Sequence, residues 1–161
     1  MTQMENIKTN QLGQPTGGDL DNWMVRPRPL RTTMTGRYCW LEPLLPGMHG
    51  AQLYEAFSED REGRDWTYLP YGPFDSKEQF NQWLQESCRG DDPLFYTVVD
   101  SRTGEAVGMA SYLRIEPVTG VIEVGHIHFS PLLQKTPLAT EAMFLMMQRV
   151  FDELAYRRYE W

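Results

Sequence analysis

The stretch from Val121 to Leu154 constrains the fold most, because it changes from the period of a strand to the period of a helix. Before Pro131, alternate residues fall on two faces, with Val121, Glu123, Gly125, Ile127 and Phe129 on one and Ile122, Val124, His126 and His128 on the other. Pro131 cannot donate to a sheet ladder, so the strand ends near Ser130. After a polar turn, apolar residues at helical spacing predict a helix with one broad buried stripe, formed by Ala139, Ala142, Met143, Met146, Met147, Val150, Phe151 and Leu154.

The junction between this strand and this helix favours an anion. Thr136 is a good N-cap, and Pro137 occupies the favoured first helical position. The main-chain amides of the loop and of the first helical turn then point outward, with a partial positive charge that suits a phosphate or pyrophosphate. Lys135 adds a point charge beside them. Every strand–helix junction has such an amino end, so the spacing alone does not identify a ligand.

The same stretch carries a family resemblance. Residues 134–139, Gln-Lys-Thr-Pro-Leu-Ala, resemble the Gln/Arg-x-x-Gly-x-Gly/Ala pyrophosphate loop of the GNAT N-acetyltransferases. The flanking Glu123-Val124-Gly125, Pro131 and Ala139-Thr140-Glu141-Ala142 are similar to the RimJ/RimL-like branch of that family. The resemblance covers residues 36–161. It implies the acyl-CoA N-acyltransferase fold, an α+β three-layer arrangement with a mixed, mainly antiparallel central sheet flanked by helices, and acetyl-CoA as the acetyl donor.

Pro137 departs from the family pattern, because it stands where the loop has its central glycine. Proline has no N–H, so one donor to the pyrophosphate is missing, at a net cost of about 1 kcal/mol. We expect weakened rather than abolished cofactor binding, and the fixed φ of proline keeps the start of the helix preformed.

Length and composition exclude several classes of protein. A chain of 161 residues predicts one domain with a real core. The formal net charge of −7 argues against a nucleic-acid partner, which needs clustered Lys and Arg. No apolar run approaches the ~20 residues of a membrane span, and no signal-peptide pattern opens the chain, so we expect a cytoplasmic protein without a membrane partner. Cys39 and Cys88 lack metal-ligand spacing and are interpreted as free thiols.

The rest of the chain predicts the other elements in order. Residues 1–31 are polar and aperiodic, which indicates an extended or disordered lead-in before a GNAT-like domain over residues 32–161. A strand at 37–41, a helix at 46–58 and a second helix opened by a Ser76–Gln79 capping box come next. Strands at 94–100, 106–115 and 121–130 have hairpin spacing and predict an antiparallel meander, and residues 157–161 again have strand character.

The resemblance also implies a continuation beyond the printed sequence. The family has a further helix and two further strands after this point, whereas this chain stops at Trp161, in or just after the fifth strand. An unpaired last strand exposes backbone groups and apolar surface. Two explanations fit: the chain is part of a longer enzyme, which we favour, or two chains form a homodimer in which each covers the open edge of the other.

Acetyl transfer requires a neutral amine, so a base or a water chain must take its proton. The candidates are Glu123, His126 and His128. Glu123 matches the Glu-x-Gly position of the family, which faces the cleft in many relatives; the alternative is a carboxylate bonded to backbone or to an arginine. An imidazole near its ordinary pKa of about 6.5 accepts a proton at neutral pH, but a histidine on a half-buried strand is more often packed or hydrogen-bonded. Two histidines without a third ligand predict no metal site.

The resemblance places the coenzyme along the end of the strand and the loop. It implies that the backbone at Phe129, Ser130 and Leu133 pairs with pantetheine. It also implies that the pyrophosphate is held by Gln134, Lys135, Thr136, Pro137, Leu138, Ala139 and Thr140, with the Thr136 hydroxyl as a further donor. In this family a backbone amide of the bulged central strand stabilises the oxyanion.

An aromatic loop between the first two helices is the candidate for acceptor recognition. Its aromatic side chains are Trp66, Tyr68, Tyr71 and Phe74, set among two prolines and a glycine. Such residues make a rigid, amphipathic contact surface. The alternative is a hydrophobic plug beneath a long connection.

Two functions therefore compete. The first is an N-acetyltransferase that moves the acetyl group of acetyl-CoA to a primary amine, either a protein N-terminus or a small amine, by direct attack in a ternary complex. The second is a catalytically inactive GNAT-like domain that binds acyl-CoA or a protein partner. A flavin or nucleotide binder is a weaker third hypothesis, because no Gly-x-Gly-x-x-Gly fingerprint supports it.

Overall fold

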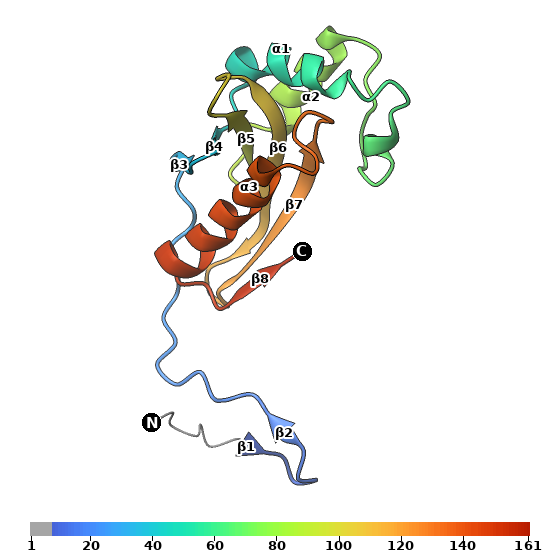
Figure 1. Cartoon of the computed structure of the whole chain (residues 1–161). Helices are drawn as coiled ribbons and strands as arrows, with labels where there is room; N and C mark the ends of the chain where they lie inside the picture. The colour runs from blue at the N-terminus through green and yellow to red at the C-terminus, as the bar shows by residue number, and fades with distance from the viewer. Residues whose placement is uncertain (1–7) are drawn as a thin grey trace.

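The computed structural model describes residues 8–161; residues 1–7, the start of the predicted lead-in, lie outside the described part. A six-stranded sheet in the order β3-β4-β5-β6-β7-β8 forms its centre, with helices against it (Figure 1). The strands are β3 (Met34–Thr35), β4 (Cys39–Pro43), β5 (Leu94–Asp100), β6 (Ala106–Glu116), β7 (Val121–Phe129) and β8 (Arg158–Glu160). The helices are α1 (Pro46–Phe57), α2 (Lys77–Ser87) and α3 (Pro137–Gln148), with a 3-10 turn, η1 (Arg64–Trp66), before α2 and a π-helical turn, η2 (Arg149–Glu153), after α3.

Two hydrophobic cores lie on opposite faces of the sheet. Alternate residues of β5 enter them: Phe95 packs with residues of α1 and α2, whereas Tyr96 and Val98 pack with residues of α3. All seven residues of β5 are buried, as expected for a central strand covered on both faces. This arrangement confirms the predicted three-layer fold with a mixed, mainly antiparallel sheet.

The strand pairing opens the sheet beside β7. Strands β5, β6 and β7 form the predicted antiparallel meander. Strand β8 is parallel to β7 and pairs with it only over Val121–Glu123. Among the described residues, the part of β7 after Glu123 therefore has no strand partner on that side, and at its end the Phe129 carbonyl accepts from the Gln134 side chain at 2.7 Å.

A β-bulge in β7 makes the predicted faces of this strand wrong. Gly125 pairs with Ser111 and His128 pairs with Met109, so His126 and Ile127 together oppose one residue of β6. His126 adopts the left-handed region, with φ of 50°. The extra residue reverses the alternation beyond it. Ile127 and Phe129 thus pack on the same core as Ile122 and Val124, whereas the two histidines, His126 and His128, turn to the aromatic side chains of the α1/α2 face.

The buried stripe of α3 also differs from the predicted one. Met147 and Phe151 are 39% and 42% exposed, while Leu138, Leu145 and Arg149 are buried. The α-helix gives way to the π-helical turn at Arg149, which shifts the spacing of later residues. The Tyr112 hydroxyl donates to the Met146 carbonyl at 2.7 Å, close to this change. Arg149 is tolerated inside because its guanidinium donates to the carbonyls of Thr32 and Thr33 at 2.7 and 3.0 Å.

The described part of the lead-in contains a small hairpin of β1 (Lys8–Thr9) and β2 (Pro15–Thr16), which projects away from the sheet in Figure 1. From Trp23 onward the segment lies along the domain: the Trp23 indole donates to the Val118 carbonyl at 2.7 Å, and the Arg26 amide donates to the Pro117 carbonyl at 3.0 Å. The domain boundary at residue 31 and the homodimer stay predictions.

No helix within residues 8–161 has the length and apolar character needed to cross a membrane.

A carboxylate from α3 fixes the entry of β4. The side chain of Glu141 accepts hydrogen bonds from the amides of Arg37, Tyr38 and Cys39 at 2.8, 2.6 and 2.9 Å. A Cβ atom on Gly36 would lie 2.4 Å from this carboxylate, so the turn requires glycine. Burial raises the pKa of Glu141, but the three main-chain donors and the Cys39 thiol lower it below its ordinary value overall.

We predict that Glu141→Gln lowers the free energy of unfolding by about 1–3 kcal/mol at neutral pH, because three donors lose a charged acceptor. A carboxyl with a lowered pKa in the folded state stabilises the protein above its unfolded pKa, and this contribution is lost as the pH falls through the folded pKa. The loss caused by the substitution is therefore expected to shrink in acid. Urea titrations of both proteins from pH 7 down to pH 3 measure this; a loss independent of pH would contradict it.

Candidate active site

The loop before α3 is held by its own hydrogen bonds. The amides of Leu133 and Gln134 donate to the Ser130 carbonyl at 2.9 and 3.0 Å. Lys135 is left-handed, with φ of 57°, and exposed. Thr136 is the N-cap, as predicted: its hydroxyl oxygen accepts from the Ala139 amide at 3.3 Å, and the hydroxyl donates to the Leu133 carbonyl at 2.7 Å. The Thr136 hydroxyl is therefore already used within the loop and has no proton left for a ligand.

Three main-chain donors remain at the start of α3. The amides of Lys135, Thr136 and Leu138 have no acceptor among the described residues, and Pro137 has no N–H. The Thr140 amide faces the Thr136 carbonyl at 3.5 Å. These three free donors lie at the amino end of a 12-residue helix, which adds partial positive charge. This geometry fits a diphosphate.

A cavity of about 360 Å³ adjoins this corner. The lining residues include Thr136, Pro137 and Leu138 from the loop and helix, together with Arg37, Tyr38 and Arg102. The Arg102 guanidinium contacts the Asp100 carboxylate at 3.0 Å. The Asp100 carboxylate also lines the cavity and offsets the Arg102 charge, so Arg37 and the helix terminus supply the remaining positive charge of this corner.

The other predicted coenzyme residues have structural roles here. Ser130 and Leu133 are fully buried, the side chains of Phe129 and Ala139 pack against the α3 core, and Ser130 donates its amide to the Val107 carbonyl at 3.2 Å. The Gln134 side chain turns inward and donates to the Asp65 carboxylate and to the Phe129 carbonyl, each at 2.7 Å. The Ser130 amide and carbonyl and the Phe129 carbonyl are thus used within the protein, and the exposed side chains among the predicted coenzyme residues are those of Lys135, Pro137 and Thr140.

His126, in the bulge, is held by a tyrosine of the aromatic loop. The Tyr71 hydroxyl and the His126 Nδ1 atom are 3.0 Å apart, and the two rings stack. Nε2 has no partner among the described residues. Burial lowers the pKa of His126, while the nearby Glu123 carboxylate opposes the shift. Burial also raises the pKa of the Tyr71 phenol, so at neutral pH a neutral imidazole faces a protonated hydroxyl.

His128 lies deeper, and its ring is enclosed by aromatic side chains. The ring centroids of Trp66 and Phe57 are 3.8 and 4.1 Å from that of His128, which is 1% exposed. Neither ring nitrogen has a hydrogen-bond partner within residues 8–161. Burial lowers the pKa of His128 to about 4, although the Asp60 carboxylate opposes the shift. His128 is a neutral packing residue at physiological pH.

Glu123 is half-buried and lies on the same face of β7 as the two histidines because of the bulge. Its carboxylate contacts the Arg114 guanidinium at 2.8 Å, an ion pair with the arginine exposed to solvent. The arginine-bonded alternative for this carboxylate is therefore the one that the structure contains. The pair leaves Glu123 able to act on His126 through its charge.

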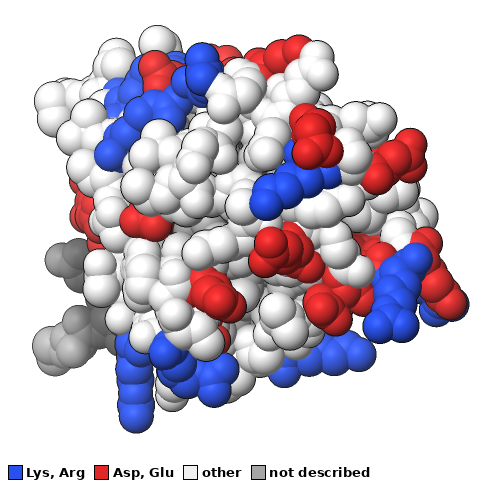
Figure 2. All heavy atoms as spheres, turned by 90° about the horizontal axis from the view of Figure 1, so that it is seen from above, with Lys and Arg blue, Asp and Glu red and all other residues white. Residues whose placement is uncertain are grey.

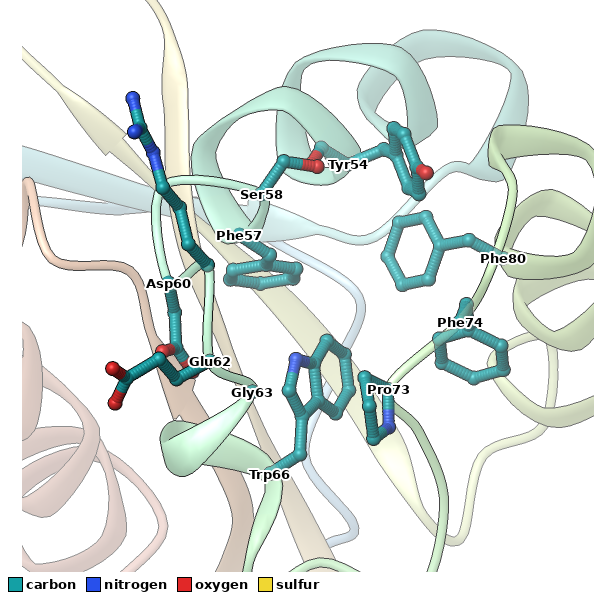
Figure 3. A pocket seen from close by; sticks show the side chains of 11 residues that line it. Tyr54, Phe57, Ser58, Asp60, Glu62, Gly63, Trp66, Pro73, Phe74 and Phe80 are labelled. Carbon is teal, nitrogen blue, oxygen red and sulfur yellow. The ribbon is translucent and has the colours of Figure 1, made fainter.

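The four aromatic residues of the predicted acceptor loop separate into different environments. Tyr68 is 97% exposed and contacts no part of the site. Trp66 and Phe74 are packed together and line a cavity of about 300 Å³ between α1 and the loop, where Figure 3 shows their rings beside Phe57 and Phe80. Only Tyr71 reaches the bulge. The hydrophobic-plug interpretation fits Trp66 and Phe74, and the contact interpretation fits Tyr71.

The sequence did not reveal the contacts that Asp65, Arg114 and Trp83 make in the site. Asp65 holds Gln134, Arg114 holds Glu123, and Trp83 packs on Tyr71 at a centroid distance of 4.1 Å. No local pattern marks them, because each acts on a residue that is distant in the sequence.

Acidic and basic side chains are interspersed on the face seen in Figure 2. Within residues 8–161, no three His, Cys, Asp or Glu side chains are grouped to hold a metal ion.

A mixed sheet flanked by helices, with a bulged strand that leads to a helix start, is the arrangement of the acyl-CoA N-acyltransferase fold. The chain belongs to the GNAT acetyltransferase family, because the model of the acetyltransferase (GNAT) domain matches residues 40–161. This family uses acetyl-CoA as its donor and binds an acceptor substrate.

Solved structures agree with this assignment. A GCN5-related N-acetyltransferase from Brucella melitensis is 45% identical, with a TM-score of 0.85; the match covers 88% of this chain and 64% of that one. A GNAT-family protein from Chromobacterium violaceum is 36% identical, with a TM-score of 0.80 and coverage of 90% and 72%. At 15% identity and a TM-score of 0.64, a protein from Vibrio cholerae described as a ribosomal-protein-serine acetyltransferase shares the fold, with coverage of 80% and 71%. No curated protein matches the chain in sequence.

We predict that His128 makes folding sensitive to acid. A histidine whose pKa is about 4 when folded and about 6.5 when unfolded stabilises the protein above pH 6.5 and loses this contribution as the pH falls to 4, by about 3 kcal/mol in total. His128→Phe keeps an aromatic ring between Trp66 and Phe57 but cannot titrate. Chemical denaturation at steps of pH is expected to show a shallower slope for the variant over this range. Equal slopes in the two proteins would rule out the prediction.

Proposed function

We propose that the protein is an N-acetyltransferase that transfers the acetyl group of acetyl-CoA to a primary amine by direct attack in a ternary complex. The observation that carries the proposal is the set of unpaired amides of Lys135, Thr136 and Leu138 at the start of α3. This set lies just beyond the bulged end of β7, where the strand has no partner after Glu123 in the described chain. A diphosphate at the amides and an extended arm along that open edge lead to His126.

The residues of this chain divide the work as follows. When bound, acetyl-CoA supplies the thioester carbonyl that the amine attacks. The free amides and Lys135 bind the diphosphate, and the open edge of β7 guides the arm toward the bulge. His126 takes the amine proton at Nε2, because burial keeps the imidazole neutral and Tyr71 holds Nδ1. Glu123 stabilises the imidazolium that forms. His128 is enclosed and only supports the aromatic wall.

The finer assignments are part of the same proposal. Glu123-Val124-Gly125 and Ala139-Thr140-Glu141-Ala142 support the RimJ/RimL-like branch, with a protein N-terminus or a small amine as acceptor. The buried, unpaired thiols of Cys39 and Cys88 suit a reducing cytoplasm. The test is calorimetric titration with acetyl-CoA, followed by a thiol-release assay over a panel of amines. Binding with turnover supports the proposal, and no binding at millimolar acetyl-CoA removes it.

A catalytically inactive acyl-CoA-binding domain is the second candidate. Two observations favour it: Pro137 removes one donor from the loop, and Glu123 is engaged by Arg114. Binding of acetyl-CoA without thiol release for any amine would select this second function.

We predict that Pro137→Ala strengthens acetyl-CoA binding about fivefold, because it restores one main-chain donor worth about 1 kcal/mol and alanine is a good helix former. Pro137 is exposed, so the substitution removes little packing. Calorimetry with acetyl-CoA measures the change. Pro117→Ala, in the turn between β6 and β7, is the matched control and is expected to bind as the parent protein does. A weaker Pro137→Ala complex would mean that the diphosphate does not lie on this helix start.

We predict that His126→Gln lowers kcat/KM by about 10²–10⁴-fold and removes the loss of rate in acid, because no imidazole is left to protonate. In the parent protein the rate is expected to fall as the pH drops through the folded pKa of His126, which lies below its ordinary value. Tyr71→Phe keeps the stacked ring but frees Nδ1, so it is expected to shift this acid limb. Tyr68→Phe, at an exposed position, is the matched control. A pH–rate profile unaltered by His126→Gln would exclude His126 as the base.

A further inference from the structure

Gln134, the first residue of the loop that carries the free amides (residues 134–138), points its side chain to the aromatic loop and not to solvent. The Gln134 Nε2 atom donates to the Asp65 carboxylate and to the Phe129 carbonyl, each at 2.7 Å. A side-chain amide nitrogen has two hydrogens, and both are therefore used inside the protein. One end of this connection belongs to the loop that carries the free amides, and the other belongs to the 3-10 turn η1.

Asp65 connects this bond to the wall of the site. Its amide donates to the Asp60 carboxylate at 2.8 Å, which fixes the turn, and the next residue is the buried Trp66. The Trp66 ring packs on His128 and contacts Tyr71 at a centroid distance of 6.2 Å. Tyr71 in turn holds His126. A continuous series of contacts thus runs from the loop that carries the free amides to the imidazole in the bulge.

The aromatic loop cannot shift without moving this series. Gly72 has φ of 74°, and a Cβ atom on it would lie 2.3 Å from the Trp66 ring. The backbone beside Tyr71 therefore lies directly against Trp66. If η1 is released, Trp66 and Tyr71 lose their common support.

We propose that Gln134 and Asp65 are positioning residues, which fix the aromatic loop (residues 60–74) relative to the loop that carries the free amides (residues 134–138). The proposal rests on the proposed acetyltransferase function and extends it: the Gln134 side chain acts on the aromatic loop and not on the coenzyme. Coenzyme bound at the neighbouring amides is then coupled to the order of residues 60–74, because both partners pack on one hydrogen-bonded unit.

The experiment compares Gln134→Ala, Asp65→Ala and the double variant with Lys135→Ala, which truncates the exposed neighbour of Gln134. Hydrogen exchange of residues 60–74 in the absence of ligand is the first measurement. Each single variant is expected to speed exchange about tenfold, and the double variant to add little, because one charge-assisted bond is lost in all three. Lys135→Ala is expected to leave exchange unchanged.

Binding and kinetics separate positioning from coenzyme contact. Acetyl-CoA affinity by calorimetry is expected to change less in Gln134→Ala than in Lys135→Ala. With an amine that is turned over, KM for the amine is expected to rise and the acid limb of the pH–rate profile to shift, since Tyr71 no longer fixes His126. Gln134→Glu sets its carboxylate against both the Asp65 carboxylate and the Phe129 carbonyl, and it is expected to loosen residues 60–74 at least as much as Gln134→Ala does.

Unchanged exchange in Gln134→Ala, together with weaker acetyl-CoA binding than in Lys135→Ala, would overturn the proposal and make Gln134 a coenzyme ligand. If the parent protein does not bind acetyl-CoA, the proposed function fails, but the exchange measurements still decide whether this bond holds the aromatic loop.

Discussion

The extra residue in β7 is the constraint on which the rest of the site depends. Without it, His126 and His128 would point into the α3 core beside Ile122 and Val124, and Ile127 and Phe129 would face the aromatic layer. With it, both sets of side chains satisfy their preferences: the aliphatic and aromatic residues complete the core, and the imidazoles join Glu123 on the opposite face. The bulge also turns the backbone of β7 at the point where β8 no longer pairs with it. The end of β7 therefore has no strand partner on one side and carries the titratable ring of His126.

The two histidines of β7 lie in different environments, His128 among aromatic rings and His126 beside the Tyr71 hydroxyl. His128 is surrounded by Trp66 and Phe57 and gains no hydrogen bond within the described residues, so it behaves as an aromatic packing residue. His126, two residues earlier, keeps a free Nε2 and has its other nitrogen held by Tyr71. Burial lowers the pKa of both, and the Glu123 charge opposes this shift at His126, which is the histidine that the proposed function uses as the base. His126 and His128 have the same side chain, and the different groups around each ring distinguish them.

Much of the fold followed from the sequence because its signals are local. The meander, the helix from Pro46, the Ser76 cap and the Thr136 cap depend on residues within a few positions of one another, and each is present. The faces of β7 did not follow, since a pattern with period two contains no sign of one inserted residue. Nor did the pairs Gln134–Asp65 and Glu141–Arg37, whose members lie 69 and 104 residues apart. Patterns reveal which segments form, and long-range polar contacts decide where their side chains point.

Glu141 raises an electrostatic question for an anion site, because it places a negative charge in the second turn of the helix that faces the diphosphate. The charge is not left free, because the Glu141 carboxylate accepts hydrogen bonds from the amides of residues 37–39. The Arg37 guanidinium beside the helix start adds the opposite sign, whereas that of Arg102 is paired with the Asp100 carboxylate. The potential at the amides of Lys135, Thr136 and Leu138 thus stays favourable to an anion. The same carboxylate that anchors β4 to α3 is in this way compatible with phosphate binding one turn away, so stability and function do not compete at this helix.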